Sequence, residues 1–145
     1  MKCKTIIDAS CKEELVTIVA KQKSKLVKDI EQLVENSSQF LKGFAQDEIK
    51  KFALCDVRCF FIEAGKVYAC LAKENLLLKT RLFEIEPLLN DWFVKINQSC
   101  IANVNHVKKF KAKFNGSLMV VFDNGHFDFV SRRQLKVVKE KFGGF

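Results

Sequence analysis

Two apolar stretches separated by a short polar corner occupy the middle of the chain. Residues Trp92–Asn103 have the sequence WFVKINQSCIAN, in which large apolar side chains flank the triplet Asn97, Gln98 and Ser99. Asn and Ser are ordinary turn formers, so a simple β-turn explains the triplet. Alternatively, buried flanks hold the corner rigidly so that it presents polar groups to another molecule. Both interpretations predict a strand, a turn and a second strand.

Short strand patterns precede this corner. Phe40–Ala53 has a mixed strand and turn pattern. β-Branched and aromatic residues favour strands, so we expect three strands after it: Val57–Glu63, Lys66–Ala72 and Leu76–Lys79. Ala64 and Gly65 predict the turn between the first two of these strands. Thr80 can cap a short helix over Arg81–Leu89. Pro87 would cost about 3 kcal/mol in a helix interior, which predicts that this helix stops or restarts there.

A three-stranded meander is predicted after the corner. Lysines alternate with apolar residues over 109–114, which predicts a strand with one basic and one apolar face. Asn115–Gly116 and Asn124–Gly125 are hairpin-turn sequences, and they lead into strands over Leu118–Phe122 and Phe127–Val130. Lysines on an outer face are usual for a solvated strand, and they also fit a rail along a phosphate backbone.

The C-terminus predicts a helix. Ser131 and Gln134 have the spacing of a capping box, and Gly143–Gly144 is a stop signal. Arg132 and Arg133 fall in the first predicted turn, where the helix dipole disfavours cations. An anion or a base edge bound there would explain both arginines. Alternatively, they simply extend into solvent.

The N-terminal forty residues predict a small β-β-α unit. Two β-rich segments, Thr5–Ala9 and Leu15–Ala20, are expected to be short strands. A helix capped by Ser24 follows and ends at Asn36–Ser38. Its apolar residues share one face: Leu26, Ile30, Leu33 and Val34. A unit of this size is too small to be stable alone, so we expect it to pack on the rest of the chain or on a second copy.

The length and charge narrow the class of protein. With 145 residues the chain forms one domain, or one domain with a small appendage. No apolar run approaches the ~18 residues of a membrane helix, and the start lacks a signal-peptide pattern, so we expect a cytoplasmic protein. Residues 1–50 carry a net charge of +1, and residues 51–145 carry +7. This asymmetry indicates a polyanionic partner, with nucleic acid ahead of membrane.

The six cysteines do not have the spacing of a metal site. They stand at positions 3, 11, 55, 59, 70 and 100, they form no C-x-x-C pair, and His106 and His126 are distant in sequence. We therefore expect small buried hydrophobic residues in a reducing cytosol, with no metal and no other cofactor. No paired carboxylates, nucleophile–base set or phosphate-binding Gly-rich loop is present, so the sequence does not indicate an enzyme or a small-molecule substrate.

Four blocks of the sequence resemble a known family. They are FFIEAGKVYACL, RLFEIEPLL, FVKINQSCIANVNHV and VSRR, and their order and spacing are similar to those of the LytTR DNA-binding domain of bacterial transcription regulators. The resemblance runs from about Leu41 to the C-terminus, which predicts a LytTR-type domain over residues 41–145. Residues 1–40 resemble the short extension of stand-alone LytTR regulators and are a candidate dimerisation segment.

The resemblance implies a mainly β (α+β) fold of antiparallel sheets with short helices, rather than a helix-turn-helix. It also implies double-stranded DNA as the partner, bound by loops in successive major grooves. Three places are expected to face bases: the turn at Gly65 and Lys66, Gln98, and Arg133. The remaining implied DNA-binding residues contact the DNA backbone or neighbour these positions: Arg81, Lys95, Asn97, Ser99, Arg132, Gln134 and Lys136.

Two positions depart from the family pattern. Family members often carry a long polar side chain where this chain has Gly65, so base contact there is expected to pass to Lys66 or to be absent. The corner commonly reads His-Arg-Ser, whereas here it is Asn97-Gln98-Ser99. Gln can pair with adenine through two hydrogen bonds, so we expect an altered sequence preference rather than lost binding.

Two functions follow as hypotheses. The first is a sequence-specific transcriptional regulator that binds repeated promoter half-sites as a homodimer. The second is a LytTR-like module used mainly for protein–protein contacts, for example with a membrane-bound inhibitor. The basic C-terminal half favours the first hypothesis.

Overall fold

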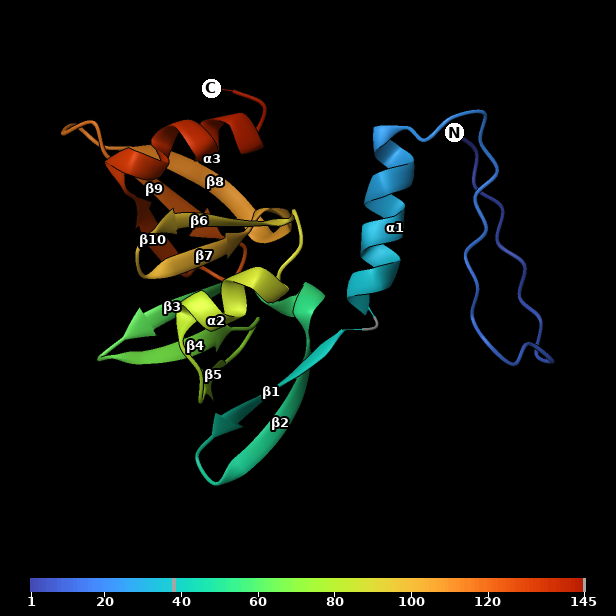
Figure 1. Ribbon diagram of the computed structural model, residues 1–145, viewed down its shortest axis with the longest axis horizontal. Coiled ribbons are helices and arrows are strands. Elements are labelled where there is room, and N and C mark those ends of the chain that lie inside the picture. Colours follow the sequence, from blue (N-terminus) through green and yellow to red (C-terminus); the bar gives the residue numbers. More distant parts are fainter. Residues whose placement is uncertain (38, 145) are drawn as a thin grey trace.

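The computed structural model describes residues 1–37 and 39–144, and within them two antiparallel β-sheets and short helices form the fold (Figure 1). The larger sheet has the strand order β2-β1-β5-β4-β3-β7-β6, and the smaller has the order β10-β9-β8. The predicted antiparallel β class is therefore confirmed. The strands are β1 (Phe40–Ala45), β2 (Glu48–Ala53), β3 (Cys59–Glu63), β4 (Lys66–Cys70), β5 (Asn75–Leu78), β6 (Phe93–Asn97), β7 (Cys100–Asn103), β8 (Val107–Ala112), β9 (Leu118–Phe122) and β10 (Phe127–Val130).

Helices connect and cover these sheets. The α-helices are α1 (Lys25–Ser37), α2 (Leu82–Ile85) and α3 (Leu135–Lys141), and the 3₁₀ turns are η1 (Leu54–Asp56), η2 (Glu86–Leu88), η3 (Val104–His106) and η4 (Arg132–Gln134). In Figure 1, α1 stands beside the sheets and the segment before it extends away from them. None of these helices, within the described ranges, is long and apolar enough to cross a membrane.

The larger sheet is buried on both faces where its central strands lie. Along β3, Phe60 packs in a core with α2, whereas Cys59 and Phe61 pack in a second core with the smaller sheet and α3. Successive side chains of a strand point to opposite faces, so a strand covered on both sides needs apolar residues at consecutive positions. This explains why the central strands have apolar runs instead of simple alternation.

The hairpin turns match the sequence predictions. Ala64 and Gly65 join β3 to β4, both with positive φ (51° and 74°), and Glu63 pairs with Lys66 across the turn. Two positive φ values are the signature of a type I′ turn, whose twist suits a two-residue hairpin. The predicted turns at Asn115–Gly116 and Asn124–Gly125 join the three strands of the smaller sheet.

The predicted N-terminal strands do not form. Thr5–Ala9 and Leu15–Ala20 contain no strand, and no side chain in either segment is buried. Strand propensity measures how well a residue fits a half-buried sheet, and these segments pair with no strand. Val16 and Ile18 instead line a groove with the α1 residues Ile30 and Val34. The helix α1 does form. Ser24 Oγ accepts a hydrogen bond from the Val27 N–H at 3.3 Å, which confirms the predicted cap, whereas Ser38, within the predicted helix end, lies outside the described residues.

The helix after β5 begins one residue later than predicted. Arg81 is its N-cap, and Thr80 instead donates its hydroxyl to Glu84 Oε2 at 2.6 Å. The Glu84 carboxylate also accepts the Arg81 backbone N–H at 3.3 Å. The α-helix ends at Ile85, and Pro87 lies at the start of a separate 3₁₀ turn, as its fixed φ and missing N–H predict.

The predicted capping box at Ser131 does not form. The Ser131 side chain makes no capping bond, and residues 132–134 form a 3₁₀ turn before α3 begins at Leu135. The Ser131 N–H donates to the Ile96 carbonyl at 2.8 Å, and the Gln134 N–H donates to the Ser131 carbonyl at 3.0 Å. The tie to β6 fixes Ser131 in an extended conformation, and the i→i+3 bond produces the tighter turn. The helix ends at Lys141, and the predicted stop residues Gly143 and Gly144 follow it with positive φ (84° and 79°).

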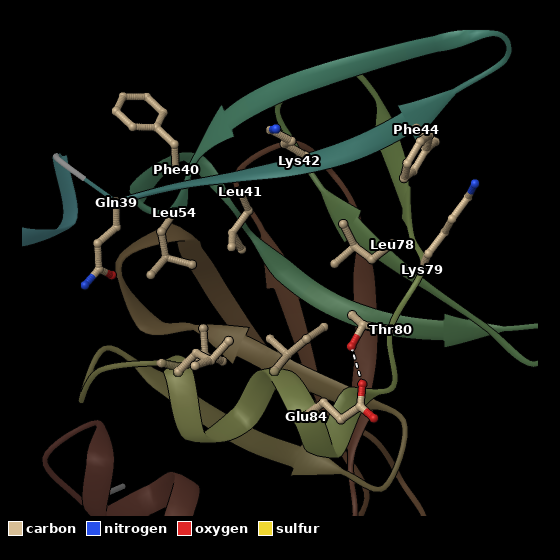
Figure 2. A pocket seen from close by; sticks show the side chains of 13 residues that line it. Gln39, Phe40, Leu41, Lys42, Phe44, Leu54, Leu78, Lys79, Thr80 and Glu84 are labelled. Atoms are coloured by element: carbon tan, nitrogen blue, oxygen red, sulfur yellow. Dashed lines mark hydrogen bonds between the residues drawn. The ribbon is translucent and has the colours of Figure 1, made fainter.

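An apolar pocket of about 530 Å³ lies between β1 and the α2–η2 segment (Figure 2). Leu41 and Leu78 line it from the sheet, and Ile85 and Leu88 line it from the helical side. The bond between Thr80 and Glu84 stands at one end (Figure 2). The pocket shows that α2 and η2 cover the sheet incompletely beside β1.

Candidate nucleic-acid interface

Three turns lie along one side of the molecule, opposite α1 (Figure 1). They are the β3–β4 turn, the β6–β7 turn and η4, and we refer to them together as the three-turn edge. Backbone hydrogen bonds connect them: the Ile62 N–H donates to the Ser99 carbonyl at 2.9 Å, and the Ser131 N–H donates to the Ile96 carbonyl at 2.8 Å. The fold therefore brings together the three places that the sequence suggested for base contact.

The β6–β7 turn is held by the side chain of Asn97. Its Oδ1 accepts the Ser99 N–H at 2.7 Å, and its Nδ2 donates to Asp128 Oδ1 at 3.1 Å and to the Phe129 carbonyl at 2.7 Å. A register shift in β6 just before Asn97 accompanies this arrangement, and such bulges redirect side chains. The turn thus presents Gln98 and Ser99, which are exposed, on a fixed frame.

Asn97 is consequently a positioning residue whose amide is already occupied. Replacing it with Ala should lower the free energy of unfolding by about 1–3 kcal/mol, because the Phe129 carbonyl and the Ser99 N–H lose their partner. Urea denaturation measures this change. Ser99→Ala is the matched control in the same turn, and it should stay close to the unaltered protein. Equal urea midpoints for the two variants would contradict the role assigned to Asn97.

The β3–β4 turn shares a groove of about 450 Å³ with the start of α2. Gly65, Lys66 and Arg81 line this groove, so two predicted contact regions that are far apart in sequence meet there. A side chain at Gly65 would meet no atom within 4 Å, but the φ of +74° would strain it. Gly65 therefore sets the turn, and Lys66 supplies the charge beside it.

The prediction that Arg132 and Arg133 lie in the first turn of an α-helix is wrong. Arg132 and Arg133 are exposed on the 3₁₀ turn η4, together with the half-buried Gln134. Because α3 starts only at Leu135, the argument from its dipole does not apply to these arginines. What their position provides is two exposed guanidinium groups next to the β6–β7 turn, with Lys136 exposed one turn further on.

Among the described residues, the basic side chains of the three-turn edge form no ion pair within 4 Å. Ion pairs within 4 Å in the described part of the chain use other cations, namely Lys23, Lys50, Arg58 and His106. None of them involves the predicted contact cations: Lys66, Arg81, Lys95, Arg132, Arg133 and Lys136. Uncompensated positive charge at a surface attracts polyanions. Lys109 and Lys111 of β8 and Lys113 in the following turn add further exposed charge.

β10 contributes to this edge in a way that no sequence pattern indicates. Asp128 and the Phe129 carbonyl, about thirty residues further along the chain, hold Asn97. The Asn124–Gly125 turn predicts β10 itself but carries no signal for its contact with β6. That contact depends on how the smaller sheet packs against the larger one.

Comparison with known proteins places the chain in a family. The sequence profile of the LytTr DNA-binding domain matches residues 47–143. Uncharacterized HTH-type transcriptional regulators of Staphylococcus aureus strains NCTC 8325 and COL are each 30% identical over 143 residues, which is 97% of this chain and 97% of each relative. The LytTr DNA-binding domain of a Bacillus cereus response regulator has a similar structure, with a TM-score of 0.68 and 23% identity, over 73% of this chain and 98% of that domain.

These findings support one another. The structural match shows a shared fold, and the profile and the relatives extend the likeness to nearly the whole chain. The relatives are named for a helix-turn-helix, whereas the matched region of this chain consists mostly of β-strands across its described residues. The chain belongs to the LytTR family of DNA-binding transcriptional regulators.

Proposed function

We propose that this regulator binds double-stranded DNA sequence-specifically, at repeated promoter half-sites, by placing the three-turn edge in successive major grooves. The observation that carries the proposal is the three-turn edge itself: exposed polar and basic side chains on three turns, of which the β6–β7 turn is linked to the other two by backbone hydrogen bonds, with no ion pair within 4 Å among the described residues. Phosphates attract such charge regardless of sequence, and side chains on rigid turns can distinguish base edges.

Within this proposal the side chains have different tasks. Arg133 and Gln98 contact base edges, and Lys66 contacts a base or a phosphate beside Gly65. Lys95, Arg81, Ser99, Gln134 and Lys136 contact the DNA backbone or support those contacts. Arg132 adds charge next to Arg133, and Asn97 holds the turn that carries Gln98.

Selection of bound sequences from a random duplex pool tests the proposal. We expect enrichment of a motif that occurs twice, with binding that weakens as salt rises. The alternative hypothesis, a module used mainly for protein contacts, predicts no enriched motif and equally weak binding to all sequences. That outcome would overturn the proposal.

The DNA-binding form in this proposal is a homodimer formed through residues 1–40, which we treat as an extension of the DNA-binding domain at 41–145. Ile7, Leu15, Val19, Leu26 and Leu33 are all exposed in this segment. Clustered exposed apolar side chains mark interaction surfaces, and a second copy offers the same apolar segment. Two copies also fit a DNA site with two half-sites.

Leu26→Glu combined with Leu33→Glu should shift a dimer to monomers at tens of micromolar, because charges would be buried in the apolar contact. Sedimentation velocity measures the change, and Gln22→Glu, on an exposed position before the helix, is the control. A chain that starts at Leu41 should also be monomeric. If the full chain is already a monomer and binds two-site DNA as well as the shortened chain does, this part of the proposal is wrong.

A further inference from the structure

A group of buried sulfur and nitrogen atoms lies between the larger sheet and the β9–β10 hairpin. Cys59 on β3 and Cys70 on β4 face each other across the strands, and His126 follows the β9–β10 turn. The two thiols and one ring nitrogen of His126 all lie within 4.8 Å of one another. Cys59 and Cys70 are 0% and 1% exposed, and His126 is half-buried, so the group lies at the edge of the core.

His126 has a ring nitrogen whose hydrogen-bonding capacity is unused. Its Nε2 is buried and, among the side chains that the structure describes, it is the one buried nitrogen or oxygen atom without a hydrogen-bond partner. The other histidine differs: His106 Nδ1 bonds Asp123 at 2.8 Å, and its Nε2 bonds the Cys55 carbonyl at 2.7 Å. Buried polar atoms are almost always satisfied, so an orphan nitrogen beside two thiols indicates a missing partner.

The chemistry of these groups suits a metal ion. Cysteine sulfur and histidine ring nitrogen are the ligand atoms that zinc prefers in proteins, and three such atoms from separate parts of the chain are already gathered here. Cys100 is a further buried thiol on the neighbouring strand β7, outside the three atoms that lie within 4.8 Å of one another. Asn124 Nδ2 donates to Cys70 Sγ at 3.3 Å, a bond of the kind that orients a ligand.

We propose that Cys59, Cys70 and His126 bind a zinc ion, with Cys100 as the fourth ligand. Two thiolates bound to one tetrahedral zinc ion at ~2.3 Å are about 3.8 Å apart, so the separations among Cys59, Cys70 and His126 need a contraction of at most about 1 Å, and Cys100 must approach them from β7. Three thiolates and one imidazole make a closed, four-coordinate set of the kind that zinc adopts in structural sites. Spacing along the sequence gave no sign of this site, because its ligands come from four separate parts of the chain.

The site would join the two sheets at the end of the β3–β4 hairpin that lies away from its turn. His126 is two residues from Asp128, whose carboxylate holds Asn97. Cys100 directly follows the β6–β7 turn, and Cys59 and Cys70 lie on the strands that lead to and from the β3–β4 turn. A bound zinc ion would therefore connect β3, β4 and β7 of the larger sheet to the smaller sheet. This inference concerns metal binding and does not depend on which DNA sequence is bound.

A cobalt titration of the full chain under a phosphine reductant tests the proposal. Co²⁺ replaces Zn²⁺ in tetrahedral thiolate sites and gives thiolate-to-cobalt absorption and visible bands that water-coordinated Co²⁺ lacks. We expect these bands to saturate at one equivalent and to disappear when one equivalent of Zn²⁺ is added. Cys70→Ser and His126→Ala should each weaken zinc binding more than about tenfold, since even the loss of a group that only orients a ligand costs that much.

The matched control replaces the three cysteines outside the group, Cys3, Cys11 and Cys55, with Ser. Its cobalt spectrum and zinc affinity should equal those of the unaltered protein. Absence of thiolate-to-cobalt absorption in the unaltered chain would overturn the proposal, whether or not the variants fold. Loss of the absorption in the control variant would overturn it as well, because the metal would then bind at exposed cysteines.

Discussion

Arg133→Ala and Gln98→Ala should each weaken binding to the selected DNA site by about 1–3 kcal/mol and leave binding to random DNA almost unchanged. Both side chains are exposed on the three-turn edge, and both can form two hydrogen bonds to one base, Arg to guanine and Gln to adenine. Three hydrogen bonds of the Asn97 side chain fix the turn that carries Gln98, so binding costs little further conformational entropy in this turn. Preference should relax at one or two base pairs.

Lys136→Ala is the matched comparison from the same region of the chain. Lys136 and Lys95 are expected to contact phosphates, whose contribution comes from released counterions and does not depend on sequence. Replacing either lysine should weaken selected and random DNA by similar factors, and it should flatten the log–log salt dependence by about one. The ratio of the two affinities should therefore stay constant, whereas Arg133→Ala should reduce it.

Gel-shift titrations at two salt concentrations give this ratio for each variant. The assignment of base and phosphate contacts is wrong if Arg133→Ala preserves the ratio and Lys136→Ala abolishes it. Equal losses on both DNA types for both variants would mean that the three-turn edge binds DNA by charge alone.

Local patterns in the sequence predicted most of the sheets. From Val57 onward the predicted strands lie close to those observed, because β-branched and aromatic residues mark strands and Asn-Gly turns mark hairpins, whereas Phe40–Ala53 predicts only a mixed strand and turn pattern. The same reasoning failed for Leu15–Ala20, although Val16–Val19 is rich in β-branched residues. Strand propensity measures how well a residue fits into a sheet, whereas the tertiary structure determines whether a sheet is present for that residue to join.

The resemblance indicates which positions form the candidate site, but not which of them contact DNA and which hold the turns in place. Asn97 looked equivalent to Gln98 and Ser99 in sequence, yet its amide is consumed by contacts with β10. The arginines at 132 and 133 looked like the start of an α-helix, yet a bond from Ser131 to β6 makes a 3₁₀ turn there. In both cases the deciding partner is a distant strand, which no local pattern identifies.

The cysteine group was predictable only in part. A two-residue turn at Ala64 and Gly65 places residue 59 opposite residue 70, so the pairing of Cys59 with Cys70 follows from the hairpin register. The approach of His126 does not follow, since it depends on how the two sheets pack. A search for metal-ligand spacing along the sequence therefore overlooks this arrangement.

Phe122→Ala should lower the free energy of unfolding by about 3–5 kcal/mol, the largest effect on stability that we predict. The Phe122 side chain is 0% exposed and lies in the core between the smaller sheet and the larger one. Its truncation removes buried apolar contacts and leaves a cavity that strands fixed on both sides cannot close. A loss of this size is a large share of the 5–15 kcal/mol that typically stabilises a domain.

Phe114→Ala makes the same chemical change in the same sheet and provides the control. Phe114 is fully exposed in the β8–β9 turn, so its replacement should change the free energy of unfolding by less than about 0.5 kcal/mol. Urea denaturation at equal protein concentration compares the two variants. Similar midpoints would mean that the smaller sheet does not pack on the larger one as described. In that case β10 would not hold Asn97, and Gln98 would not be presented on a rigid turn.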